Sequence, residues 1–145
     1  MILTREDLGN LGLGDWALGW ADTVRFGELD PLGHVNNAAY LVWFEALRVR
    51  HLTAIGFTQY RPEDPRFVVA ALDATYRAEL KLHEDYVLAT RCTRVGRTSF
   101  VMAYRCMAGG RADAASGSAT VVMLRDGRPA PLSDEQRAAL GADAS

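Results

Sequence analysis

The chain has 145 residues, a formal net charge of −2, 49% hydrophobic residues and 23% charged residues. This length and composition fit one globular domain, and a slight acidic excess with scattered arginines argues against a nucleic-acid or membrane-surface partner. No stretch approaches the roughly 18 apolar residues that a membrane-spanning helix needs.

The first segment, residues 1–19, contains four glycines and Trp16, with Trp20 directly after it, and predicts a loosely ordered N-terminal arm. Its first residues include acids where a signal peptide has basic residues and an apolar run, so we expect a cytoplasmic protein. In that compartment the two cysteines, Cys92 and Cys106, are expected to be reduced thiols in strands. A first strand is predicted over residues 20–26.

The next regular element is a helix over residues 38–55 that is apolar on nearly every face, and such helices are normally buried. Two capping candidates, Asn36 and Asn37, precede this helix, and Gly56 follows it as a residue suited to its C-terminal end. The helix is therefore expected to form the centre of the fold.

Four strand-like runs follow, at residues 67–79, 85–95, 99–107 and 114–124. Glycines at 96, 109 and 110 supply the turns between the last three, and Ser133 with Gln136 forms a capping box for a short C-terminal helix.

This order of elements predicts an α+β fold in which one long helix lies against a five-stranded antiparallel sheet. We expect a single domain over residues 1–145, with the arm at 1–19 and a short helix and tail at 133–145. One helix cannot cover both faces and both edges of such a sheet. An exposed edge invites pairing with another chain, so self-association is expected.

The most informative stretch joins the first strand to the helix. Asp30 sits in a short turn that contains Pro31 and Gly33, directly before the start of the apolar helix. Free N–H groups at a helix N-terminus can hold a developing oxyanion, and a carboxylate can act as nucleophile or base. This arrangement suits hydrolysis of a polarised carbonyl, such as an ester or a thioester.

Residues 24–37, VRFGELDPLGHVNN, followed by Tyr40, Phe44, Glu45 and Arg48, resemble the hotdog-fold acyl-CoA thioesterases, in particular the 4-hydroxybenzoyl-CoA thioesterase-like branch. The resemblance implies a sheet wrapped around the central helix and a homodimer or a dimer of dimers. It implies an acyl-CoA substrate. It implies no separate cofactor, because coenzyme A is itself part of that substrate.

The resemblance also assigns roles to residues at the helix start. Asp30 corresponds to the aspartate that attacks the carbonyl or activates water, and the backbone N–H of Asn37 corresponds to an oxyanion donor. His34 could position water or orient Asp30, or it could bond to a backbone carbonyl. The other substrate-binding candidates of this region are Gly33, Asn36 and Tyr40. Glu28 is expected to be solvated or bonded to a backbone amide near the site.

A second group of candidates, Arg97, Thr98 and Ser99, lies in the turn that corresponds to a region near the pantetheine arm and phosphates of coenzyme A. Arg97 could bind a phosphate or remain solvated. Acyl-ACP thioesterases place asparagine where this chain has Leu32, which favours coenzyme A over acyl carrier protein.

Several alternatives remain open. Glu45 could be a catalytic helix carboxylate, although it is spaced to pair with Arg48. The same fold also supports an acyl-thioester hydratase or dehydratase and a non-catalytic acyl-CoA-binding protein. No metal site is expected, because the three histidines are dispersed and neither cysteine has a neighbouring ligand. No G-x-S-x-G motif is present, which argues against a serine hydrolase.

Overall fold

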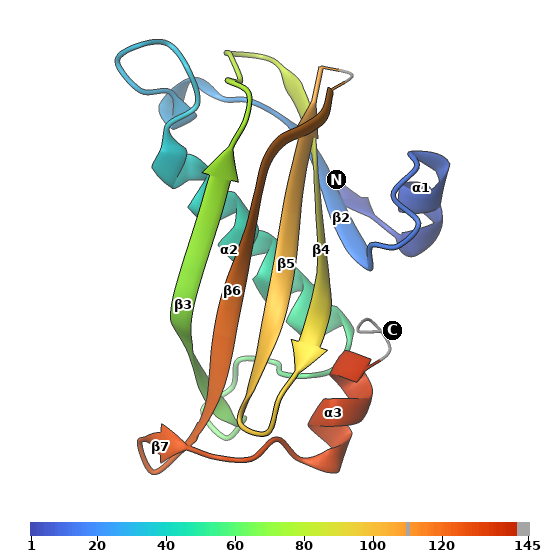
Figure 1. The fold of residues 1–145 in the computed structure, drawn as a ribbon, viewed down its shortest axis with the longest axis vertical. Helices are drawn as coiled ribbons and strands as arrows, with labels where there is room; N and C mark the ends of the chain where they lie inside the picture. Colours follow the sequence, from blue (N-terminus) through green and yellow to red (C-terminus); the bar gives the residue numbers. More distant parts are fainter. Residues whose placement is uncertain (110, 142–145) are drawn as a thin grey trace.

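The computed structural model describes residues 1–109 and 111–141. At its centre the helix α2 (Asn37–Ala54) lies against one face of an antiparallel sheet (Figure 1). The strand order is β1-β2-β4-β5-β6-β3, with β7 paired to β6. The strands are β1 (Ile2–Leu3), β2 (Leu18–Thr23), β3 (Arg66–Tyr76), β4 (Asp85–Val95), β5 (Ser99–Ala108), β6 (Arg111–Arg125) and β7 (Arg128–Pro129).

The predicted helix and the five predicted strands are confirmed to within a few residues at most of their ends. The sheet of the described residues has seven strands and not five, because the two-residue strands β1 and β7 add to its edges and are too short to leave a pattern in the sequence. The helix begins after Asn36, whose side-chain oxygen accepts the Ala38 amide, and it ends before Gly56, which adopts φ 75°. The C-terminal helix α3 (Asp134–Gly141) is preceded by the predicted capping box, in which Ser133 and Gln136 exchange hydrogen bonds. The expected turn at 109–110 and the end of the tail lie partly outside the described residues.

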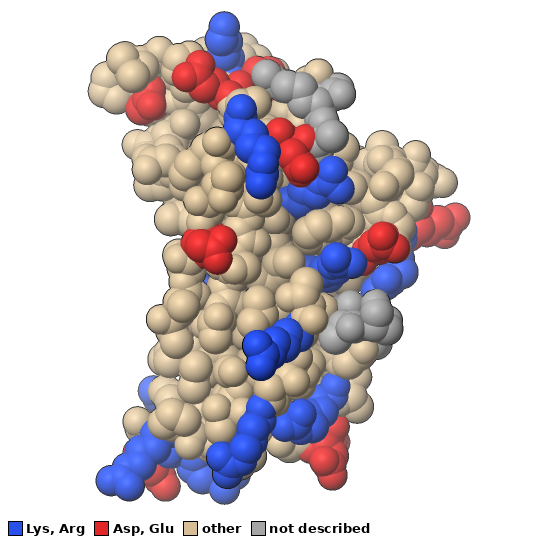
Figure 2. Space-filling view, in the orientation of Figure 1, with Lys and Arg blue, Asp and Glu red and all other residues tan. Residues whose placement is uncertain are grey.

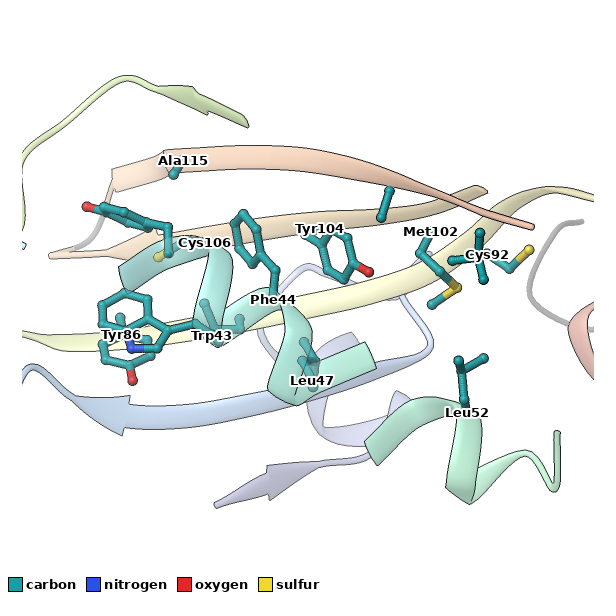
Figure 3. Close-up of a cluster of buried hydrophobic side chains, with 14 of the residues drawn as sticks. Trp43, Phe44, Leu47, Leu52, Tyr86, Cys92, Met102, Tyr104, Cys106 and Ala115 are labelled. Atoms are coloured by element: carbon teal, nitrogen blue, oxygen red, sulfur yellow. The ribbon is translucent and has the colours of Figure 1, made fainter. Parts of the chain in front are cut away.

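The core is formed between α2 and the long central strands. Along β5 every second residue is buried, as a strand with one covered face requires. Figure 3 shows Phe44 beside Tyr104 and Trp43 beside Tyr86, and both ring pairs are stacked. A Cβ atom at Gly117 would lie 3.2 Å from the Phe44 ring and 2.6 Å from the Asp73 carbonyl oxygen, so glycine at this position lets α2 approach the sheet closely.

The N-terminal arm is ordered, and the prediction of a loose arm is wrong. The helix α1 (Arg5–Asn10) begins at a capping box between Thr4 and Asp7, and β1 pairs with β2. The arm then packs on the side of the sheet away from α2, where Leu8 and Leu13 are buried with neighbouring apolar residues. Local capping and two buried leucines therefore outweigh the flexibility of the glycines.

The strand β3 is the long edge strand of the sheet, and its core-facing side is open. Val69, Leu72 and Tyr76 pair with buried residues of β6 and so share the face that α2 covers elsewhere. Their exposed fractions are nevertheless 41%, 48% and 43%. An eleven-residue edge with exposed apolar side chains is a surface that sheet proteins normally cover.

Candidate functional site

The turn that carries Asp30 is closed by its own hydrogen bonds. The Asp30 amide donates to the His34 carbonyl at 2.8 Å, and the Gly33 amide donates to the Asp30 carbonyl at 3.0 Å. Gly33 adopts φ 83°, a conformation that favours glycine. The side-chain oxygen Oδ1 of Asp30 accepts the amides of Leu32 and His34 at 2.9 and 3.3 Å. Within the described part of the chain, no hydrogen bond reaches Oδ2, so one carboxylate oxygen is fixed and the other is open to chemistry.

The N-terminus of α2 has the donor that the sequence predicts. Asn36 is the capping residue, and Asn37 is the first residue of the 18-residue helix. The amide of Ala38 is taken by the Asn36 side chain and that of Ala39 by the Asn36 carbonyl. The Asn37 amide has no acceptor among the described residues, so it is available at the positive end of the helix.

Asp30 and Asn37 belong to one short hairpin. Leu29 and Val35 form an antiparallel β-bridge. Next to it, at the base of the hairpin, the Asn36 amide donates to the Glu28 carbonyl at 2.8 Å. This hairpin carries the carboxylate at its turn and leads directly into the helix N-terminus. The predicted grouping of the acid with the start of the helix is therefore a consequence of local chain geometry.

The other candidates from this region lie around the same hairpin. Tyr40 is buried and packs against Trp43 and Tyr76, with ring centroids 5.1 and 5.2 Å apart. The Nε2 atom of His34 lies 3.0 Å from a carboxylate oxygen of Glu79. The histidine ring is thus engaged by an acid on the neighbouring segment, while its backbone amide helps to hold Asp30.

Tyr76, which the sequence did not single out, also reaches the start of the helix. Its hydroxyl donates a hydrogen bond of 2.9 Å to the carbonyl of Asn37. The last residue of β3 thereby fixes the peptide that follows the free amide. The tyrosine is recognisable in the sequence only as part of a strand, because its partner lies 39 positions away.

Glu28 is bonded to a backbone amide near the site, as predicted, and it has a second partner that sequence reasoning missed. Its Oε1 atom accepts the Arg25 amide at 2.8 Å, and its Oε2 atom accepts the indole N–H of Trp43 at 2.5 Å. Glu28 and Trp43 also line a pocket of about 290 Å³ beside the first turns of α2. The pocket is otherwise mainly apolar, with lining residues Gly27, Leu29, Asn36, Ala38, Ala39 and Val42.

The second carboxylate on the helix, Glu45, lies away from this hairpin. It is eight residues along α2 from Asn37, or about 12 Å at the rise of an α-helix. Glu45 pairs loosely with Arg48 at 3.8 Å, and the side chains are 68% and 9% exposed. The Arg48 guanidinium donates to the hydroxyl of Tyr104 at 2.9 Å, and burial raises the pKa of that hydroxyl despite the nearby positive charge.

The turn with Arg97, Thr98 and Ser99 lies at the opposite end of the subunit. The Asp30 hairpin pairs with Lys81, shortly before β4 begins, whereas the second turn follows the end of that strand at Val95. Eleven strand residues span about 35 Å, so one subunit alone does not bring Arg97 to Asp30.

The end of the molecule that carries Arg97 is rich in arginine. Figure 2 shows basic side chains gathered at its lower end, where β3 begins and β6 ends. Arg66, Arg97, Arg125 and Arg128 are all exposed there. Within the described residues, no group of three or more histidine, cysteine or acidic side chains could hold a metal ion. No described helix is long and apolar enough to cross a membrane.

Comparison with known families agrees with this geometry. A family model described as the thioesterase-like superfamily matches residues 24–140, which include the Asp30 hairpin, α2 and the strands β3 to β7. This chain belongs to the thioesterase-like superfamily. Its helix and antiparallel sheet accordingly form a hotdog fold.

Two solved structures are similar to this chain over most of their length. The chain is 41% identical to a thioesterase-superfamily protein from a Jannaschia species, with a TM-score of 0.88 over 99% of this chain and 94% of that one. It is 36% identical to a thioesterase from Thermus thermophilus solved in complex with coenzyme A and zinc, with a TM-score of 0.78 over 87% of this chain and 92% of that one.

One curated relative is matched over part of its length. YsmA of Bacillus subtilis (strain 168), an uncharacterised protein, is 26% identical over 82 residues, which are 57% of this chain and 55% of YsmA. The match thus covers about half of each protein.

Proposed function

We propose that this protein hydrolyses acyl-CoA thioesters to the free acid and coenzyme A. The observation that carries the proposal is the Asp30 hairpin, which combines a carboxylate that has one open oxygen with a helix whose first amide has no acceptor among the described residues. Membership of the thioesterase-like superfamily supports the reaction type, and the coenzyme A complex of the Thermus relative supports the carrier.

In the proposed reaction, the thioester carbonyl is polarised by the Asn37 amide and the positive end of α2. Asp30 either takes a proton from the attacking water or attacks the carbonyl itself and forms an anhydride that water then hydrolyses. In both routes the carbon–sulfur bond breaks and the thiolate of coenzyme A leaves. The electron pair that arrives on the carbonyl oxygen during attack is held by the helix amide.

The proposed active form is a homodimer joined through β3. This strand is an exposed edge, and the apolar side chains on its core-facing side are left uncovered by α2. Antiparallel pairing of two β3 strands about a two-fold axis sets Arg66 of one copy near Tyr76 of the other. Since Tyr76 contacts Asn37, the arginine-rich end of a second copy would then approach the Asp30 hairpin.

This dimer also gives a role to the distant substrate-binding candidates. Arg97, Thr98 and Ser99 belong to the arginine-rich end, and guanidinium groups are well suited to phosphate recognition. In the proposed dimer they bind the phosphates of an acyl-CoA whose thioester lies at the hairpin of the other copy. A further association of dimers into a tetramer stays a prediction.

A panel of acyl-CoA thioesters tests the function directly. Short, medium and aromatic acyl-CoA substrates are incubated with the purified protein, and free thiol and free acid are measured together. Equal release of both products from at least one substrate is expected. Addition of water to an enoyl-CoA without thiol release would identify a hydratase, and binding without any turnover would identify an acyl-CoA-binding protein; either result overturns the proposal.

A further inference from the structure

Glu28 connects three parts of the chain that meet at the site. Its side chain accepts the Arg25 amide and the Trp43 indole, and its carbonyl accepts the Asn36 amide. The first contact closes the short 3-10 helix η1 (Phe26–Glu28), the second ties that turn to the body of α2, and the third reaches the capping residue of α2. One residue therefore joins the base of the Asp30 hairpin to the helix at two points.

The tip of the hairpin has little freedom of its own. The turn from Asp30 to His34 is closed by backbone bonds in both directions, and the same turn supplies both amides that hold the Asp30 carboxylate. Its internal geometry is thus fixed, and the position of the carboxylate relative to the Asn37 amide depends on how the hairpin base is attached to α2.

Trp43 is a rigid anchor for that attachment. Its ring is buried, stacks on Tyr86 at 4.2 Å with an interplanar angle of 13°, and meets the edge of Tyr40 at 5.1 Å. The direction of the indole N–H is therefore fixed by packing on two sides. A bond from a fixed donor to a carboxylate is charge-assisted and stronger than a bond between neutral groups.

We propose that Glu28, held by the indole of Trp43, is a positioning residue that sets Asp30 at its working distance from the N-terminus of α2. This role rests on the proposed thioesterase function. Because a misplacement of about 1 Å can cost on the order of 100-fold in rate, loss of the bond should slow the chemical step. Binding of the acyl-CoA should change little, because in the proposed dimer the phosphates of coenzyme A are bound by Arg97, Thr98 and Ser99 of the other copy.

Three variants test the bond. Trp43→Phe removes the N–H donor and keeps an aromatic ring over Tyr86. Glu28→Gln keeps the size of the side chain but leaves a single side-chain acceptor for two donors. The third variant combines both changes. We expect each single change to lower kcat by about 10- to 100-fold with KM within about threefold of wild type. The double variant should be no slower than the slower single variant, because both changes remove the same bond.

The chain offers a matched control in a second indole–carboxylate pair. The indole N–H of Trp20 donates to Asp22 at 3.2 Å, and Asp22 in turn pairs with the Arg25 side chain. Within the described part of the chain, no hydrogen bond joins Trp20 or Asp22 to Glu28 or to the Asp30 turn. Trp20→Phe should keep kcat within about twofold of wild type. Thermal melting of all variants shows whether each is folded, and Glu28→Gln alone carries the test if Trp43→Phe does not fold.

The outcomes separate the two proposals. If wild type releases no thiol from any acyl-CoA, the proposed function itself fails. If wild type is active, the positioning role is overturned by near-normal kcat in Glu28→Gln, by an equal loss in Trp20→Phe, or by fully multiplicative effects in the double variant. A loss confined to KM would likewise overturn it, because it would show contact with the substrate in place of control over Asp30.

Discussion

Replacing Glu45 by glutamine should change stability only slightly and leave catalysis intact. The nearest Arg48 nitrogen is 3.8 Å away, and the Glu45 side chain is 68% exposed. Two unit charges about 4 Å apart in water attract by about 1 kcal/mol, and exposed pairs in proteins contribute about 0–1 kcal/mol. The free energy of unfolding should therefore fall by less than about 1 kcal/mol. Breaking an ion pair of which both members are buried would instead cost about 3–5 kcal/mol.

The buried member of the pair, Arg48, keeps a second partner when Glu45 is changed. Tyr104→Phe removes the hydroxyl that accepts from the Arg48 guanidinium, and an unsatisfied buried donor costs about 1–3 kcal/mol. Tyr104→Phe should therefore be more destabilising than Glu45→Gln. Glu63→Gln is a matched control, because Glu63 is 69% exposed and 3.7 Å from Arg61.

Urea unfolding and acyl-CoA turnover, measured on the same samples, check this reasoning. Glu45→Gln and Glu63→Gln should have similar midpoints and wild-type kcat. If Glu45→Gln unfolds like wild type but loses turnover as severely as a variant of Asp30, then Glu45 is the catalytic carboxylate. If it is more destabilising than Tyr104→Phe, then the buried guanidinium depends on Glu45 and not on the tyrosine.

Three further outcomes follow from the structure. Arg97→Ala should raise KM for acyl-CoA more than it lowers kcat and should leave an acyl-pantetheine substrate unaffected; equal effects on both substrates would show that Arg97 does not hold the nucleotide. Light scattering should give an even-order oligomer for wild type and a smaller species for Leu72→Arg, because Leu72 is 48% exposed on the β3 edge. A wild-type monomer at micromolar concentration would contradict the interface. Burial raises the pKa of Asp22, but the Thr23 amide, the neighbouring indole and the Arg25 guanidinium together outweigh burial, so the pKa is lowered. The ionised form of Asp22 thus stabilises the fold above pH about 4. Unfolding measured across pH should show that the stability difference between wild type and Asp22→Asn shrinks as the pH falls below that value. A constant difference would refute this.

Elements with strong local signals could be predicted closely. The helix Asn37–Ala54 is marked by an asparagine cap, an apolar run and Gly56, and each of these acts within a few residues of the chain. The Asp30 hairpin is equally local, because the bonds within it join residues no more than about eight positions apart.

Features that depend on long-range packing could not be predicted. The glycines of the arm are visible in the sequence and suggest a loose segment, whereas burial of Leu8 and Leu13 against the sheet is not visible there. Trp43 looks like one more apolar residue of the helix, and its bond to Glu28, 15 positions away, required the fold. Arg97 could be placed in a turn but not in space, and only the length of β4 shows that it lies far from Asp30 within one subunit.

The central claim is that Asp30 carries the hydrolysis, and turnover of the best acyl-CoA substrate by folded Asp30→Asn tests it most directly. Asparagine retains a side-chain oxygen that can accept the Leu32 and His34 amides, so the turn should keep its shape, but it can neither attack a carbonyl nor take a proton from water. Asp85→Asn, at an exposed aspartate that accepts from Thr23, is the matched control. The account predicts a fall of roughly 100-fold or more in kcat for Asp30→Asn and none for Asp85→Asn. Near-normal turnover in folded Asp30→Asn would contradict it.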